Sequence, residues 1–299
     1  MYYSDIFFYK MKRRKTQNII FIYLLLILVV FAIITFIAYQ VNNKKKDIFI
    51  QSNKKQVERS INYALKFQTN QTHQVLFDYS FWDEMIDFIN KKDLRWAKNN
   101  IDPIITTFKV SSVCLFDIQR KNIYCVTNDE SGFLRNYIVN ESIYDSLVNS
   151  RFTRFYDKTP FGIVEFFGAT VHPSTDPQRI TNPQGYLFIS RIIDNNYIKT
   201  LSEITGTEVS LIVDTLNIKS SKHLIVVNKP IKLYNSGSYV YFHFEKDLPF
   251  IEQYNKFSNE FIGLFYLTAL GFILAFLFLT TRWINKPLRI VEDSLKSDD

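Results

Sequence analysis

Two long runs of uncharged, mostly apolar residues lie near the two ends of this chain. The first covers residues 19–39 and reads IIFIYLLLILVVFAIITFIAY, and the second covers residues 261–281 and reads FIGLFYLTALGFILAFLFLTT. A bilayer core takes about 20 apolar helical residues to cross, whereas a buried helix of a globular protein rarely stays uncharged for so long. Both runs are therefore predicted to be transmembrane helices.

The residues that flank these runs predict the topology. The polar sequence QVNNKKK follows the first run, where a cleaved signal peptide would have small residues, so the first run is expected to remain as an anchor. Basic residues dominate residues 1–18 and recur in residues 282–299. Because basic flanks stay on the cytoplasmic side, both termini are predicted to be cytoplasmic and residues 40–260 extracytoplasmic.

The distribution of charge narrows the choice of partners. The net charge of +7 divides into +4 for residues 1–39, +4 for residues 40–259 and −1 for residues 260–299. The outer segment is nearly balanced and has no dense basic stripe, which argues against a nucleic-acid partner. The basic N-terminal cluster instead suits the anionic surface of a lipid bilayer.

The first transmembrane run is expected to continue as a long amphipathic helix. Apolar residues recur at steps of four and three through residue 89, with two polar positions in the middle and a possible bend at residues 68–73. The predicted seam contains Val57, Ile61, Ala64, Gln68, Gln71, Val75, Tyr79, Trp82, Ile86 and Ile89. Such a seam could face a partner chain, as in a homodimer, or the chain's own domain, and its period does not decide between them.

The rest of the outer segment mixes helices and strands. Helices are expected from Asp93, with a break at Pro103, and over residues 140–149 and 195–206, the last with Gly206 as its end cap. The β-rich segments are residues 110–118, 122–127, 151–158, 162–171, 185–193, 207–214, 223–233 and 238–246. Short links between them predict an antiparallel sheet flanked by helices. The expected fold class is α+β, with the layout of PAS-like or Cache-like extracytoplasmic sensors.

The stretch DYSFWDEMIDFIN, residues 78–90, combines acids with large aromatic residues. One interpretation is structural: Ser80 and Asp83 form a helix-capping pair, acids in the first turn complement the helix dipole, and Trp82 is buried. The other interpretation is that Asp83 points into a pocket beside Trp82 and binds a cationic or hydroxylated ligand. The acids lack the spacing of a calcium-binding loop, so no metal site is predicted.

Three stretches resemble a known family. DYSFWDEMIDFINKKDLRWAKNNID, FFGATVHPSTDPQRITNPQGYLFISR and LSEITGTEV are similar to the CHASE domain of the fourth class, the extracytoplasmic sensor of bacterial histidine kinases and cyclic-di-GMP enzymes. The Trp82–Asp83 pair, residues 168–170 and residues 185–191 carry the resemblance. It implies a sensor in a bacterial inner membrane that regulates a C-terminal kinase or diguanylate cyclase, but it implies no particular ligand.

The C-terminal residues fit the same arrangement. The sequence KPLRIVEDSL resembles the start of a HAMP linker, and it also suits a coiled-coil linker to a further domain. Ile284, Leu288, Val291 and Leu295 are spaced as a short heptad seam. We expect the chain to continue into an output domain beyond Asp299.

Histidines and arginines supply further candidate ligand-binding residues. His172 lies in the sequence VHPSTDPQR, and the four histidines lack the spacing of a zinc site. Arg179 and Arg191 could hold a ligand carboxylate, or they could pair with Asp83 or Glu84 as structural salt bridges, which is the favoured reading. The candidate ligand-binding residues are Trp82, Asp83, His172, Arg179 and Arg191, with no cofactor expected.

The two cysteines, Cys114 and Cys125, are both expected outside the cytoplasm, where a disulfide can form. If the turn between their strands covers residues 118–121, residues whose numbers sum to 239 face each other, and Cys114 faces Cys125. A one-residue shift of register would separate them. The pair is therefore a possible disulfide.

No nucleophilic triad, phosphate-binding loop or paired-histidine motif is present in the outer segment, so no enzyme is predicted within these residues. The first functional hypothesis is a membrane-anchored sensor of a small ligand. The alternatives are a chemoreceptor without catalytic output and a membrane-anchored structural or adhesion protein.

Overall fold

The computed structural model describes residues 2–129, 131–213, 224–287, 290 and 294. These residues form two compact units. The first, here called the helix-pair unit, contains residues 1–53 and 248–299. The second, here called the sheet unit, contains residues 54–247. The terminal seam that was predicted at Ile284, Leu288, Val291 and Leu295 falls outside the residues whose side chains are described.

Two long helices contain the apolar runs. Helix α1 covers Tyr2–Tyr79 without interruption, so the bend expected at residues 68–73 does not break the helix. Helix α7 covers Pro249–Thr280 and ends in a π-helical turn, η2, Thr281–Asn285. Two stretches, Leu25–Tyr79 and Pro249–Trp283, are long and apolar enough to cross a membrane. The rest of the protein covers almost none of the most apolar part of either stretch. Helices whose apolar side chains stay uncovered in this way suit the hydrocarbon core of a membrane.

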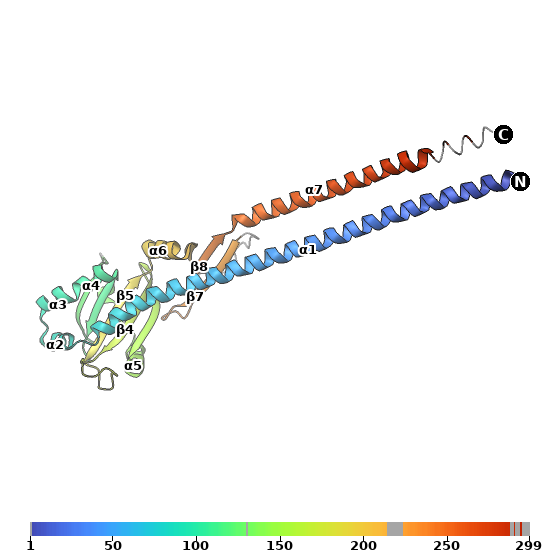
Figure 1. Ribbon diagram of the computed structural model, residues 1–299. Helices are drawn as coiled ribbons and strands as arrows, with labels where there is room; N and C mark the ends of the chain where they lie inside the picture. The colour runs from blue at the N-terminus through green and yellow to red at the C-terminus, as the bar shows by residue number, and fades with distance from the viewer. Residues whose placement is uncertain (1, 130, 214–223, 288–289, 291–293, 295–299) are drawn as a thin grey trace. The chain divides into compact units, whose positions relative to one another are not determined.

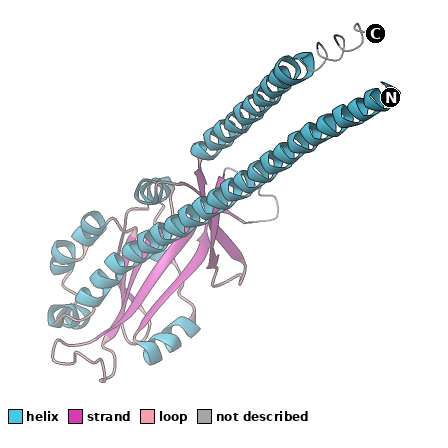
Figure 2. Ribbon diagram, turned by 45° about the vertical axis from the view of Figure 1, so that its right-hand side comes forward, coloured by secondary structure: helices cyan, strands magenta, loops and turns pink. Residues whose placement is uncertain are grey.

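The sheet unit contains two antiparallel sheets, where the sequence predicted one (Figure 2). The first has the order β2-β1-β5-β4-β3. Its strands are β1 (Ser112–Phe116), β2 (Asn122–Thr127), β3 (Phe152–Thr159), β4 (Gly162–Val171) and β5 (Gly185–Ile192). The second has the order β6-β8-β7, with β6 (Glu208–Ile212), β7 (Leu224–Lys232) and β8 (Tyr239–Asp247). A bridge between Tyr156 and Leu233 joins the two sheets.

Short helices surround the five-stranded sheet (Figure 1). They are α2 (Asp83–Lys91), α3 (Leu94–Asn100), α4 (Asp102–Phe108), η1 (Leu134–Asn136), α5 (Glu141–Ser150) and α6 (Asn195–Thr205). Local sequence explains their ends: the Asp93 carboxylate accepts bonds from the first turn of α3, and Pro103 opens α4. Gly206 caps α6 in the left-handed conformation, as predicted.

Alternating side chains give the five-stranded sheet two apolar faces. Val113 and Leu115 of β1 pack with Val75 and Leu76 of α1 and with residues of α2, α3 and α4. Cys114 and Phe116 point to the other face and pack with α5 and η1. The predicted α+β fold, with an antiparallel sheet and a long N-terminal helix, is confirmed.

The buried seam of α1 faces the chain's own sheet unit rather than a partner. Val57, Ile61, Ala64 and Val75 are buried as predicted, but Thr72 is buried in place of Gln71. Beyond Tyr79 the predicted seam is correct only at Ile89, because α1 ends at Tyr79 and a new helix, α2, begins at Asp83. Helix α2 buries Met85, Phe88 and Ile89, whereas Tyr79, Trp82 and Ile86 are partly exposed.

Candidate functional site

Four of the five predicted site residues meet where α1 ends and α2 begins. Trp82 and Asp83 start α2, while His172 and Arg179 belong to the loop between β4 and β5. The backbone N–H of His172 donates to the Ser80 carbonyl at 3.0 Å, which fixes this loop against the helix end. Arg191 lies elsewhere, on β5. Residues 172–182, which fold over the end of α1, are here called the latch loop.

Arg179 is buried and binds the C-terminal end of α1. Its guanidinium donates to the Phe77 carbonyl at 3.3 Å, to Ser80 Oγ at 2.9 Å and to the Thr170 carbonyl. It also lies over the rings of Phe77, Phe81 and Phe152. A cation at the end of a helix complements its dipole, and aromatic faces favour it further. Burial lowers the pKa of Arg179 to about 10.

The expected salt bridge of Arg179 to Asp83 or Glu84 is therefore wrong. Neutral carbonyl and hydroxyl oxygens take its donors instead, because carbonyls at a helix end have no partner within the helix. Its Nε is buried and has no hydrogen-bond partner among the described residues.

His172 is fully buried inside the latch loop. Its Nε2 lies 3.0 Å from Thr170 Oγ1, and its Nδ1 lies 3.3 Å from Thr181 Oγ1 and from Asp176 Oδ2. Burial lowers the pKa of His172, and the nearby Arg179 and Arg151 lower it further. Asp176 accepts hydrogen bonds from the backbone and the hydroxyl of Thr181, and that hydroxyl lowers the pKa of Asp176.

Asp83 also ties α2 to the latch loop. Its carboxylate accepts the Ser174 backbone N–H at 2.8 Å and the Ser174 hydroxyl, which lowers the pKa of Asp83. The predicted capping pair of Ser80 and Asp83 is wrong: Trp82 occupies the N-cap position, and no side chain caps α2. Ser80 is instead buried, donates to Phe77 and accepts from Arg179.

Trp82 is partly exposed, so the prediction that it is buried is wrong in degree. Its ring packs edge-on against Tyr79, with centroids 5.7 Å apart, and lies tilted against Trp96, with centroids 5.1 Å apart. Trp96 Nε1 donates to Glu84 at 3.2 Å. These contacts and those of the latch loop fasten the start of α2.

Arg191 belongs to a buried charged cluster on the face of the sheet that packs with α1. Its Nη2 lies 2.6 Å from Glu165 on β4, and its Nη1 donates to both the carbonyl and the side chain of Gln68 on α1. The other Glu165 oxygen lies 2.6 Å from Arg154 and accepts the Tyr156 hydroxyl at 2.7 Å. The salt bridge expected for Arg191 exists, but its partner is Glu165 rather than Asp83 or Glu84.

An open groove of ≈ 590 Å³ runs along β2, the edge strand of the five-stranded sheet. It is here called the β2 groove, and its lining includes Lys98, Asp102, Tyr124, Arg135 and Asn136. The Tyr124 hydroxyl donates to Asp102 at 2.6 Å. Burial raises the pKa of Tyr124, and the Asp102 carboxylate raises it further. Lys98 and Arg135 make no ion pair with any residue in the described ranges.

Cys125 also lines the β2 groove. Cys114 on β1 faces it directly, and the two are joined as a disulfide. The predicted register, in which paired numbers sum to 239, is confirmed from Ser112 to Leu115; a bulge then shifts Phe116. Within the residues that the structure describes, no group of three or more histidine, cysteine or acidic residues is arranged to hold a metal ion.

Comparison with protein families identifies the central part of the chain. Residues 64–212 match the CHASE4 domain, from the last turns of α1 to the end of β6. The chain contains a CHASE4 domain. This domain includes the latch loop, the charged cluster and the β2 groove, and apolar helical stretches lie on both sides of it in the sequence. It is a sensor domain, and no catalytic family was found in the chain.

Several solved structures of low sequence identity resemble the chain. The LuxQ periplasmic domain of Vibrio cholerae is 10% identical, with a TM-score of 0.37 over 66% of this chain and 97% of that one. A domain of a putative sensory box/GGDEF family protein from Vibrio parahaemolyticus is 10% identical, with a TM-score of 0.46 over 71% and 99%. The ligand-binding domain of the Campylobacter jejuni chemoreceptor Tlp3, in complex with L-valine, is 9% identical, with a TM-score of 0.39 over 71% and 97%. No curated protein matches the chain significantly.

Sequence analysis missed four members of the charged cluster in the CHASE4 domain: Glu165, Gln68, Arg154 and Tyr156. Two of them, Glu165 and Gln68, left a signal in the sequence. Glu165 is the one charged residue in the apolar strand GIVEFFGATV, and Gln68 is a polar residue inside the predicted seam of α1. A buried acid requires a cation and a partly buried amide gains from a partner, and Arg191 satisfies both.

Proposed function

We propose that the chain is a membrane-anchored sensor that detects a small ligand outside the cytoplasm. Residues 19–39 and 261–281 would cross the membrane, and residues 40–260 would lie on the extracytoplasmic side. The signal would pass to a cytoplasmic output domain after residue 299, such as a histidine kinase or a diguanylate cyclase. The basic residues outside both apolar runs support this topology.

The observation that carries this proposal is the direct connection of the sheet unit, which contains the CHASE4 domain, to both apolar helices. Helix α1 enters the domain without a break, and only Leu248 separates the end of β8 from the start of α7. A continuous helix carries a displacement along its axis better than a flexible linker does. A change in the domain would therefore move both helices.

We propose the β2 groove as the ligand site. Lys98 and Arg135 offer two cationic groups at its walls, and Tyr124 holds the Asp102 carboxylate in place. The terminal guanidinium nitrogens of Arg179 and Arg191, by contrast, bind groups of the protein itself, and the Nε of each is buried. The ligand class that fits the groove is a small molecule carrying a carboxylate or phosphate group, since both pair with lysine and arginine.

The charged cluster would carry the signal from the sheet to α1. Arg191 connects Glu165 on β4 to Gln68 on α1, so a shift of the strands changes the contact that holds the helix. Strand β5, which carries Arg191, pairs with β1, and β1 pairs with β2 at the groove. A path of hydrogen-bonded strands thus leads from the proposed ligand site to the helix.

We also propose that the sensor works as a homodimer through the exposed face of α1. Because the buried seam packs on the chain's own sheet unit, a partner needs a different face. Tyr63 and Phe67 are 75% and 56% exposed and lie one helical turn apart. A second copy would cover these two aromatic side chains. Cysteine at position 67 should then cross-link two copies, while cysteine at the neighbouring position 66 should do so less.

A screen of the full chain in detergent tests the ligand site. Thermal shifts against a library of small carboxylates and phosphates should identify a stabilising compound. Lys98→Gln and Arg135→Gln should each remove that shift, because a charge-assisted contact is lost. Lys121→Gln is the matched control and should keep it, since Lys121 is exposed outside the groove. A shift that survives both groove substitutions would place the ligand elsewhere.

A further inference from the structure

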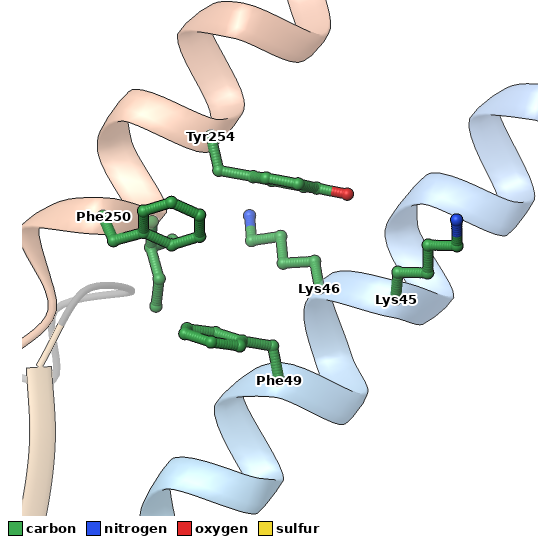
Figure 3. A pocket seen from close by; sticks show the side chains of 6 residues that line it. Lys45, Lys46, Phe49, Phe250 and Tyr254 are labelled. Carbon is green, nitrogen blue, oxygen red and sulfur yellow. The ribbon is translucent and has the colours of Figure 1, made fainter.

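The helix-pair unit contains a small pocket between α1 and α7, here called the interhelical pocket (Figure 3). Its volume is ≈ 210 Å³, and it is lined by Lys45, Lys46 and Phe49 of α1 and by Phe250, Ile251 and Tyr254 of α7. The rings of Phe49 and Phe250 lie 5.4 Å apart and form one wall. Figure 3 shows the Lys46 ammonium group reaching from α1 toward α7 between the aromatic side chains.

Polar side chains join the two helices beside the pocket. Lys46 Nζ donates to Asn255 Oδ1 at 2.9 Å. Toward the apolar runs, the Tyr254 hydroxyl donates to Asn42, and the Asn42 amide donates to Ser258 Oγ. An ammonium group has three donors, so Lys46 keeps two for a further acceptor, and Lys45 makes no hydrogen bond or ion pair with any described residue. The pocket therefore offers unused positive charge beside apolar walls.

The position of the pocket along the helices corresponds to the headgroup layer of a membrane. Lys45 lies six residues after Tyr39, the end of the first apolar run, which is about 9 Å along a helix. Tyr254 lies seven residues before Phe261, the start of the second run, which is about 10 Å. Headgroups extend about 5–8 Å beyond each side of the hydrocarbon core. Flexible lysine side chains can reach back over the small remaining distance.

The charges around the pocket favour an anion. Lys44, Lys45 and Lys46 are consecutive, so their positive charge is concentrated at one level of α1. The nearest acids in sequence, Asp47 and Glu252, are exposed and do not line the pocket. Aromatic residues beside lysines are also the composition that proteins use at a membrane interface. The site thus combines a cationic centre with walls that suit glycerol and the first methylene groups of an acyl chain.

We propose that the interhelical pocket binds the phosphate of an anionic phospholipid in the extracytoplasmic leaflet. The phosphate would accept hydrogen bonds from Lys46 and Lys45, and the lipid would contact Phe49 and Phe250. Because the pocket is built from both helices, the bound lipid would link the incoming and outgoing helices of the sensor. This inference rests on the proposed membrane anchoring.

Lipid retention by the full chain tests the proposal. The chain is extracted into detergent, mixed with phosphatidylglycerol or phosphatidylcholine, and examined by native mass spectrometry. We expect phosphatidylglycerol to be retained preferentially, and Lys46→Gln to weaken its retention about tenfold, because a charge-assisted contact is lost. Lys44→Gln removes the same charge outside the pocket and should retain the lipid as the unchanged chain does.

Three results would overturn the proposal. Equal retention of both lipids would show that the pocket does not prefer an anionic headgroup. Equal weakening by Lys46→Gln and Lys44→Gln would reduce the effect to general charge attraction. Displacement of the lipid by millimolar inorganic phosphate would indicate a site for free phosphate. Carbonate extraction of membranes separates these outcomes from a failure of anchoring. A chain that stays in the membrane but shows no lipid preference contradicts this inference alone. A chain that carbonate releases from the membrane contradicts the proposed function.

Discussion

Arg191 Nη2 lies 2.6 Å from Glu165 Oε2, and both side chains are buried. The pair joins neighbouring strands β4 and β5, and Arg191 extends it to Gln68 of α1. Removing one partner of a buried ion pair leaves an unpaired charge, which costs much more than the intact pair contributes. The folded state of the CHASE4 domain should therefore depend strongly on both residues.

Glu165→Gln should lower the free energy of unfolding by about 3–5 kcal/mol, since it leaves Arg191 buried without a counter-charge. Denaturant unfolding followed by tryptophan fluorescence measures this, because Trp82 and Trp96 both lie in the sheet unit. Asp87→Asn is the control. Its ion pair with Lys91 is largely exposed, so its loss should cost less than about 1 kcal/mol. Equal effects of the two substitutions would contradict the buried-pair account.

Gly185→Ala should destabilise the sheet unit more than Gly168→Ala. A Cβ at Gly185 would lie 2.6 Å from the backbone oxygen of Phe116, which β-sheet pairing holds in place. A Cβ at Gly168 would meet side-chain atoms of Phe188 and Thr153, which can move. We expect a cost of about 1–3 kcal/mol at Gly185, measured by denaturant unfolding. A larger cost at Gly168 would mean that the strands are spaced differently.

The domain should lose stability as the pH falls below 6.5, the ordinary pKa of histidine. Burial lowers the pKa of His172 in the folded chain. At a pH between this lowered pKa and 6.5, the unfolded chain therefore binds a proton that the folded chain does not. His172→Asn should reduce the difference in melting temperature between pH 7.5 and pH 5.5. His73→Asn, at an exposed position, should leave it unchanged.

A second loss of stability is expected in stronger acid. Hydrogen bonds from Ser174 and Thr181 lower the pKa of Asp83 and Asp176. The stability that these two carboxylates contribute is therefore present above 3.8, the ordinary pKa of the group, and is lost as the pH falls below it.

A melting temperature that stays constant from pH 7.5 to pH 5.5 would contradict the role given to His172.

Cys114 and Cys125 should be joined in protein taken from its native membrane. Peptide mapping without reductant should recover the two cysteines in one linked fragment. Closing a loop of this length stabilises a domain by about 2–3 kcal/mol, so reduction should lower the unfolding midpoint. Two free thiols in unreduced protein would show that the bridge does not form in the cell.

Local patterns were sufficient to predict most elements of this fold. The predicted β-rich segments correspond to observed strands, and the predicted end cap at Gly206 corresponds to the end of α6. The length of one turn was sufficient to predict that Cys114 lies opposite Cys125. These features depend on residues that are close in sequence, where the period of side chains and the chemistry of turns decide the outcome.

The contacts of the candidate site depend on residues far apart in sequence, and the predictions failed there. Ser80 looked like a helix cap, but Arg179, 99 residues later, binds it at the end of α1. Arg191 was expected to pair with acids near residue 83, but Glu165 lies directly opposite it on the next strand. The spacing of these residues in the sequence does not indicate which of them meet after α1 packs on the sheet.

The measurement that tests the central claim most directly is cysteine labelling of the full chain in intact cells with an opened outer membrane. Ser52→Cys and Ser236→Cys lie in the segment proposed to be extracytoplasmic, and Ser294→Cys lies beyond the second apolar run. An impermeant maleimide should label positions 52 and 236 without further treatment, and position 294 only after the inner membrane is permeabilised. The parent chain should remain unlabelled, because its two cysteines are bridged. Labelling at position 294 in intact cells, with positions 52 and 236 protected, would contradict a sensor that faces the cell exterior.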